Sequence, residues 1–179
     1  MGTIVVATDG SRAAGAALDE AIALATATGD RLEVITVWRA LQGDFGLSYP
    51  SAALLHELLD AERAHAERTL ADAAERARAA GVEVEVALVA GDPAEQICRH
   101  ASRVRARLVA VGTHGYGAVV SLLVGSVSSN VIRSAPCPVL VVRAPVETSW
   151  EPATASPPGR ETAAGEAAQT SSSRPLASA

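Results

Sequence analysis

The residues best suited to chemistry are spaced glycines that follow an apolar run, Leu108 to Val111. Gly112 and Gly115 come directly after this run, and Gly125-Ser126 follows with nine residues between Gly115 and Gly125. A glycine lacks the Cβ that would keep the backbone away from an anion. Backbone N–H groups in such a loop, and at the start of the next helix, suit a phosphate. The spacing predicts a phosphate-binding loop; the alternative is that these glycines serve only tight packing and a turn.

A carboxylate follows the first apolar run of the chain. Asp9 comes directly after Thr3 to Thr8, and Gly10-Ser11 continues the turn. Asp9 could accept hydrogen bonds from ribose hydroxyls or, through water, help to hold Mg²⁺, which prefers carboxylate, water and phosphate oxygens. Its alternative role is that of a turn or cap residue.

Several kinds of chemistry are excluded by what the sequence lacks. All fifteen basic residues are arginine, so there is neither a Walker A lysine nor a Schiff-base lysine. The turn after the first apolar run has no Gly-x-Gly-x-x-Gly pattern, which disfavours a dinucleotide-dependent dehydrogenase. Cys98 and Cys137 lie far apart, without metal or redox spacing, and are interpreted as small buried apolar side chains. Beyond His114 and Asp9, no base for phosphoryl transfer is evident.

The elements that must position these residues alternate between strand and helix patterns. Strands are predicted over 3–8, 32–38, 82–89, 108–111 and 139–142. Helices are predicted over 12–28, 51–80 and 94–104 and after Gly125, where Ser126 is expected to cap the fourth. This alternation predicts a single α/β domain with a doubly wound, five-stranded parallel sheet.

Two groups of polar residues are expected to face solvent. His56 and His65, in the helix over 51–80, lack the spacing of a zinc pair and are predicted to be surface residues. Arg103, Arg105 and Arg107 precede the fourth strand, at the end of the sheet opposite to the ligand-binding end, and are also assigned to solvent.

The glycine pattern resembles the nucleotide-binding signature of the universal stress protein family. The segment VSSNVIRSAPCPVLVV, which follows Gly125-Ser126, is similar to the closing helix and strand of that family. The resemblance extends more loosely over residues 3 to 143. In that family the signature marks the members that bind ATP.

The resemblance implies a Rossmann-like sheet with strand order 3-2-1-4-5, which brings Asp9 and the glycine loop together at the switch point. It implies ATP with Mg²⁺ as the ligand, with Val37 and Val111 flanking the adenine. Asp9 is the proposed indirect metal ligand, acting through water. The residues expected around the nucleotide are Ala7, Asp9, Val37, Val111, Gly112, His114, Gly115, Gly125, Ser126 and Val127.

Composition limits the possible partners and the location of the chain. The net charge of −5 argues against a general nucleic-acid binder, and no apolar run approaches the ~20 residues of a membrane helix. The start of the chain has no signal-peptide pattern, so a cytoplasmic protein is expected. Residues 1–146 are predicted to form the nucleotide-binding domain. Residues 147–179, rich in Pro, Ser, Thr, Ala and Gly, are predicted to be a disordered tail.

Together these features predict a stress-response, ATP-binding regulator that acts as a homodimer. The strand over 139–143 is apolar on both faces yet lies at a sheet edge, which invites a second copy to pair with it. The family resemblance implies the same antiparallel pairing. Two alternatives stay open: a weak ATPase or phosphotransfer enzyme, and a scaffold that works without nucleotide.

Overall fold

The structure, a computed structural model, describes residues 1–38, 51–113 and 125–144. Its strands are β1 (Thr3–Ala7), β2 (Arg31–Trp38), β3 (Val84–Ala90), β4 (Leu108–Gly112) and β5 (Val139–Val142). Its helices are α1 (Arg12–Thr28), α2 (Ala52–Ala79), α3 (Pro93–Arg103) and α4 (Ser126–Ser134). The predicted tail, 147–179, lies outside the described residues.

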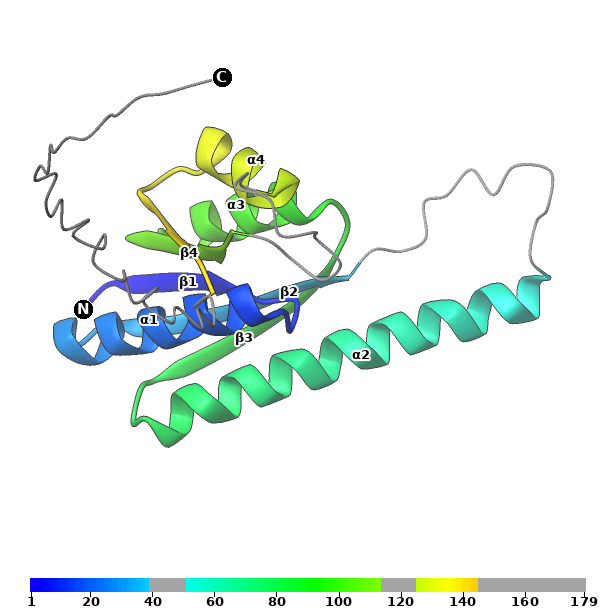
Figure 1. Cartoon of the computed structure of the whole chain (residues 1–179), viewed down its shortest axis with the longest axis horizontal. Coiled ribbons are helices and arrows are strands. Elements are labelled where there is room, and N and C mark those ends of the chain that lie inside the picture. The colour runs from blue at the N-terminus through cyan, green and yellow to red at the C-terminus, as the bar shows by residue number, and fades with distance from the viewer. Residues whose placement is uncertain (39–50, 114–124, 145–179) are drawn as a thin grey trace, which may run out of the picture. The chain divides into compact units, whose positions relative to one another are not determined.

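The five strands form one parallel sheet with the order β3-β2-β1-β4-β5, which confirms the predicted α/β fold (Figure 1). β1 lies between β2 and β4. The connection after β1 leads to β2 on one side, and the connection after β4 leads to β5 on the other. The carboxyl ends of β1 and β4 are therefore neighbours at the switch point, where open α/β sheets bind ligands. In the described part of the chain, no helix is both long and apolar enough to span a membrane.

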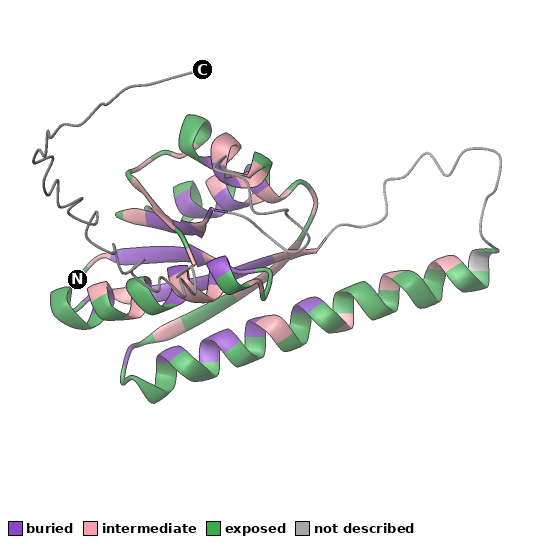
Figure 2. Ribbon diagram, in the orientation of Figure 1, coloured by how far each residue is buried: buried purple, intermediate pink, exposed green. Residues whose placement is uncertain are grey.

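Aliphatic side chains cover the two faces of the sheet. One core lies between the sheet and helices α1 and α2; its largest members are Ile4, Leu18, Leu32, Val34 and Leu70. The other lies on the α3 and α4 face; its largest members are Val5, Ile35, Ile97, Val109 and Val131. Figure 2 shows the buried residues concentrated in the central strands.

Local signals placed most helix ends correctly. Ser11 accepts a hydrogen bond from the Ala14 N–H at the start of α1, and Gly29 ends this helix with φ of 68°. Asp92 caps α3, with Pro93 at its first position. These caps satisfy backbone groups that a helix end leaves unpaired, so short sequence patterns are enough to predict them.

α2 is buried only in its second half. Its apolar stripe reaches the core at Ala66 and beyond, whereas Leu54 and Leu58 are 46% and 43% exposed. The first half of α2 therefore contributes little to the core of the described structure (Figure 2).

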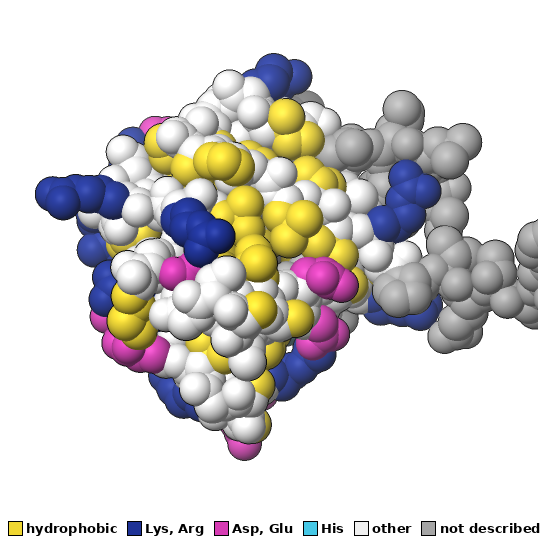
Figure 3. All heavy atoms as spheres, turned by 90° about the vertical axis from the view of Figure 1, so that its left-hand side faces the viewer, with side chains coloured by type: hydrophobic (Ala, Val, Ile, Leu, Met, Phe, Trp, Pro, Cys, Tyr) yellow, Lys and Arg dark blue, Asp and Glu magenta, His cyan; other side chains and the backbone are white. Residues whose placement is uncertain are grey.

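A hydrogen-bonded carboxylate closes the amino end of the sheet. Asp30 accepts from the Gly2 N–H at 2.5 Å and from Thr28 Oγ1 at 2.8 Å, and it pairs with Arg107. The Gly2 hydrogen bond, followed by those from Thr28 and Arg107, lowers the pKa of Asp30 despite its burial. The assignment of Arg107 to solvent was therefore incomplete, because its guanidinium reaches a buried carboxylate. Figure 3 faces this end of the molecule and shows charged side chains of both signs beside hydrophobic ones.

A second polar group joins β2 to α3. Glu33 Oε2 lies 3.0 Å from His100 Nε2, and both side chains are only 4% exposed. Arg103 Nη2 lies 3.0 Å from His100 Nδ1. Arginine can only donate, so Nδ1 accepts and Nε2–H donates to Glu33. Arg103, also assigned to solvent from the sequence, thus fixes the tautomer of a buried histidine.

Candidate functional site: a cavity at the carboxyl end of the sheet

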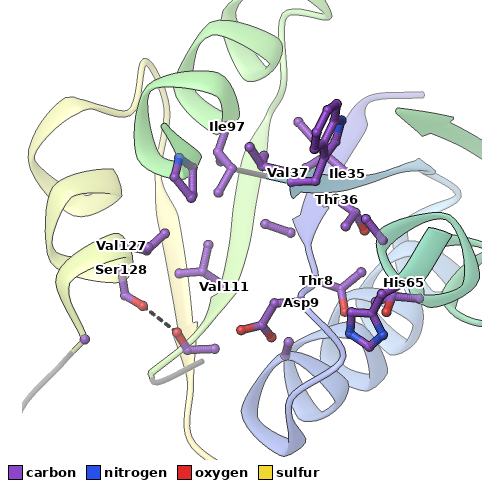
Figure 4. A pocket seen from close by; sticks show the side chains of 18 of the residues that line it. Thr8, Asp9, Ile35, Thr36, Val37, His65, Ile97, Val111, Val127 and Ser128 are labelled. Carbon is purple, nitrogen blue, oxygen red and sulfur yellow. Dashed lines mark hydrogen bonds between the residues drawn. The ribbon is translucent and has the colours of Figure 1, made fainter. Parts of the chain in front are cut away.

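A cavity of about 700 Å³ lies where β1, β2 and β4 end. Side chains from α2, α3 and α4 complete its walls (Figure 4). Of the residues predicted to surround a nucleotide, the structure brings Ala7, Asp9, Val37, Val111, Gly112, Gly125, Ser126 and Val127 to this cavity. His114 and Gly115 lie outside the described residues.

The turn after β1 shapes the floor of the cavity. The Thr8 N–H donates to the Ile35 carbonyl at 3.0 Å, which fixes the turn to β2. Gly10, with φ of 79°, donates its N–H to Thr8 Oγ1 at 3.2 Å. The Ser11 N–H donates to Asp9 Oδ1 at 3.0 Å. Asp9 therefore serves as a turn residue and also lines the cavity, so the two roles considered for it are compatible.

Gly112 is required by packing. A Cβ on Gly112 would lie 2.5 Å from the Ala13 carbonyl carbon and 2.7 Å from the Ala14 nitrogen. No side chain fits there, because the atoms it would meet belong to the backbone of α1. The close approach of β4 to α1 therefore explains why residue 112 is a glycine. This is the packing role that the sequence offered as the alternative to phosphate binding.

The start of α4 has no side-chain cap. Its N-cap residue is Gly125, and Ser126 is the first residue of the helix, so the prediction that Ser126 caps it was wrong. The Gly125 N–H donates to the Thr113 carbonyl at 2.6 Å. Ser128 donates its hydroxyl to the Gly112 carbonyl at 2.6 Å, which ties α4 to β4. By contrast, serine or aspartate side chains cap α1, α2 and α3.

Uncapped N–H groups give the cavity a positive end. The N–H groups of Ser126, Val127 and Ser128 belong to the first turn of α4, which has no intrahelical acceptors for them. The helix dipole adds partial positive charge at the same place. This helix start lines the cavity and suits an anion.

The α3 and α4 side of the cavity is an apolar slot. Ile35, Val37, Ile97, Val111 and Val127 line it (Figure 4). Val37, Val111 and Val127 are among the residues predicted around a nucleotide, whereas Ile97 is not. Helix α3 begins at Pro93, shortly after the carboxyl end of β3. The short Gly91-Asp92 turn between them was the sequence signal that the first turns of α3, including Ile97, lie at the ligand-binding end of the sheet.

The opposite side of the cavity is polar and includes α2. Thr8, Thr36, His65 and Thr69 line it, together with the Glu62 carboxylate. His65 was predicted to be only a surface residue; it is exposed, but it lies at the cavity wall beside Thr8 (Figure 4). Residues 62, 65, 66 and 69 share one helix face, so their spacing contained the signal that was missed.

The described residues do not form a metal centre by themselves. Within the described ranges, no group of three His, Cys, Asp or Glu side chains could hold a metal ion. Burial raises the pKa of the Cys98 and Cys137 thiols, which disfavours their ionisation to the nucleophilic thiolate. Both cysteines pack against the α3 and α4 core.

Comparison with known proteins agrees with this arrangement. A family model described as "Universal stress protein family" matches residues 1–143. The chain belongs to the universal stress protein family. A relative from Thermus aquaticus, "Universal stress protein in QAH/OAS sulfhydrylase 3'region", is 39% identical over 141 residues, which cover 79% of this chain and 98% of the relative.

Two solved universal stress proteins of similar fold are described with nucleotides. One is a universal stress protein in complex with cAMP, with a TM-score of 0.61 and 31% sequence identity. The match covers 80% of this chain and 98% of that protein's chain. The other is from Archaeoglobus fulgidus in complex with dAMP, with a TM-score of 0.56 and 26% sequence identity. This match covers 79% of this chain and 97% of the other.

Proposed function

We propose that this universal stress protein binds ATP with Mg²⁺ in the cavity at the carboxyl end of its sheet. The observation that carries the proposal is the combination of an apolar slot with an uncapped helix start in one cavity. A flat base fits between Val37, Val111 and Ile97, and phosphate oxygens fit the N–H groups that open α4. Relatives described with cAMP and dAMP support an adenine nucleotide as the ligand class.

The metal part of the proposal rests on Asp9. Mg²⁺ in nucleotide sites keeps several waters and takes one or two carboxylates plus phosphate oxygens. A single carboxylate at the cavity floor fits this need, whereas a site made only of protein ligands would require more groups than the described residues bring together. Asp9 would hold the ion through water, and the ion would neutralise phosphate charge.

We propose binding, with at most slow hydrolysis, as the activity. Phosphoryl transfer needs positive charge beside the transferred group. The described lining of the cavity contains no arginine side chain, and the positive charge that the described residues offer to a phosphate there is that of the backbone dipoles at the start of α4. This supports a nucleotide-responsive regulator of the stress response, acting in the cytoplasm as the sequence predicts.

A proline at position 126 tests the phosphate site. Ser126→Pro removes one N–H and the hydroxyl at the first position of α4, where proline suits a helix. ATP affinity should fall at least tenfold, about 1.4 kcal/mol, while the melting temperature stays near that of the wild type. Ser126→Ala is the matched control, because it removes only the hydroxyl. Calorimetry showing wild-type ATP affinity in folded Ser126→Pro would contradict the phosphate assignment.

We also propose a homodimer through β5. All four β5 residues are apolar and half-buried, at one edge of the described sheet. The Pro138 carbonyl accepts from the Val109 N–H of β4, and the Val142 carbonyl accepts from the N–H of Thr113, the residue after β4. Because hydrogen-bonding directions alternate along a strand, Val139 and Val141 direct their N–H and C=O groups toward the open edge. A two-fold copy would pair with these groups and close the edge.

Proline substitutions at the two sheet edges test the dimer. Val141→Pro removes an outward N–H from β5, and Val86→Pro does the same on β3, where the Glu83 carbonyl accepts from β2 and residue 86 faces outward. Proline is tolerated at such edge positions. Sedimentation equilibrium should give a dimeric wild type, a dimer weakened at least tenfold by Val141→Pro, and no change with Val86→Pro. A wild type that is monomeric at micromolar concentration would exclude the dimer.

A further inference from the structure

The cavity has a third wall, on the α2 side, that neither the base slot nor the start of α4 uses. Thr8, Thr36, His65 and Thr69 line it, with the carboxylates of Asp9 and Glu62 beside them. In Figure 4, Thr8, Thr36 and His65 lie together on this side, across the cavity from Val127 and Ser128. The base slot and the start of α4 take two of the three chemically different parts of a nucleotide. The third is the ribose, for which the sequence offered only Asp9 as an acceptor.

Thr36 is the residue on this wall that folding does not explain. It is 3% exposed, and its Oγ1 has no hydrogen-bond partner among the described residues. Leu32 and Val34 precede it on the same face of β2 and are fully buried apolar residues. Valine has nearly the shape of threonine, and it would fill this position without leaving a hydroxyl unpaired. The unpaired group occurs where the strand reaches the cavity.

The hydrogen-bonding groups of this wall decide which part of a nucleotide it fits. Two carboxylates, Asp9 and Glu62, line the cavity together with the threonine hydroxyls. Carboxylate and hydroxyl oxygens accept hydrogen bonds, so this wall offers acceptors to groups that donate. The ribose carries neutral hydroxyls that both donate and accept, so it matches this wall better than the base or the phosphates do.

We propose that the α2-side wall binds the ribose and that Thr36 forms a hydrogen bond with one of its hydroxyls. The inference rests on the proposed nucleotide binding and adds a preference for ribonucleotides over deoxyribonucleotides. Rotation about the Thr36 Cα–Cβ bond moves its hydroxyl to another staggered position. The bound sugar then supplies the partner that the hydroxyl lacks.

The test compares three ligands with three forms of the full chain. Calorimetry gives the Kd of ATP, 2′-deoxy-ATP and 3′-deoxy-ATP for the wild type, for Thr36→Val and for Thr26→Val. Thr26 is the matched control, because its hydroxyl donates to the Ile22 carbonyl on the exposed side of α1. The wild type and Thr26→Val should bind ATP at least fivefold more tightly than one of the deoxy ligands.

Thr36→Val should lose this preference by binding ATP as weakly as that deoxy ligand, whose own Kd stays unchanged. Without nucleotide, Thr36→Val should melt at a higher temperature than the wild type, because no buried hydroxyl is left unpaired. Thr36→Val should thus weaken ATP binding while it stabilises the nucleotide-free protein. A purely structural role of Thr36 would not give this combination.

Equal affinity of the wild type for all three ligands would overturn the inference and leave nucleotide binding intact. An equal weakening of all three ligands by Thr36→Val would also overturn it. Failure of every ligand to bind would instead overturn the proposed function, and this inference with it. The wild-type comparison needs no variant, so it decides the ribose preference even where Thr36→Val does not fold.

Discussion

The two ends of the parallel sheet treat their polar groups differently. At the amino end, Asp30 has three hydrogen-bonding partners, and Glu33 is paired with His100. At the carboxyl end, the Thr36 hydroxyl has no partner among the described residues, and α4 begins without a side-chain cap. Both ends are made from the same strands, so the difference does not follow from strand structure itself.

The difference indicates which polar groups serve the fold and which are available to a ligand. A buried polar group costs free energy unless it is paired, so a group that serves only the fold is expected to have its partner within the protein. The amino end meets this expectation. The carboxyl end leaves donors and acceptors facing a cavity, where a ligand can pair with them.

The largest effect is expected where a paired buried group loses its partner. His100→Ala leaves the Glu33 carboxylate buried without its donor, which should cost about 3–5 kcal/mol of unfolding free energy. Urea denaturation measures the loss. Glu33→Leu combined with His100→Leu should recover most of it, because no buried charge remains. A double variant as unstable as His100→Ala would mean that packing, not pairing, dominates at this end.

A smaller loss of stability is expected from a substitution at Gly112, where α1 packs too closely for a side chain. Gly112→Ala places a methyl group against the backbone of α1 and should cost about 1–3 kcal/mol. Gly15→Ala is the matched control, because its Cβ would meet only Arg76 Nη1, at 3.8 Å. In the interior of α1, that change should stabilise the protein by roughly 0.5–1 kcal/mol. Unchanged thermal stability of Gly112→Ala would contradict the packing role.

The smallest effect is expected from the charge of Asp30. Its pKa is lowered in the folded protein, first by the Gly2 N–H and then by Thr28 and Arg107. A lowered carboxyl pKa stabilises the fold above the unfolded pKa, and this contribution is lost as the pH falls through the folded pKa. Asp30→Asn should therefore be less stable than the wild type at neutral pH. The difference should shrink below about pH 4, the ordinary range of an aspartate.

Urea denaturation of the wild type and Asp30→Asn at a series of pH values measures this difference. A gap that stays constant down to acidic pH would show that the charge of Asp30 does not contribute. The half-exposed Arg107 side chain is screened by solvent, which is why a modest effect is expected.

The sequence by itself determined the order and type of the elements and the end of the sheet at which the candidate site was to be sought. Ser11, Gly29 and Asp92-Pro93 mark helix ends through bonds within a few residues, so their effects can be predicted locally. The alternation of strands and helices gives the α/β class, and the glycine spacing indicated the family. The strand order came from that resemblance and is the order observed.

The tertiary structure alone decided which distant residues share a contact. Glu33 and His100 are 67 residues apart, and Gly112 meets α1 nearly a hundred positions earlier in the chain. The packing of α2 against β2 places His65 and Thr36 in the wall of the same cavity. No short pattern encodes these pairs, because they arise from the crossing of helices over the sheet. The same glycine or threonine serves packing or binding according to what the fold places next to it.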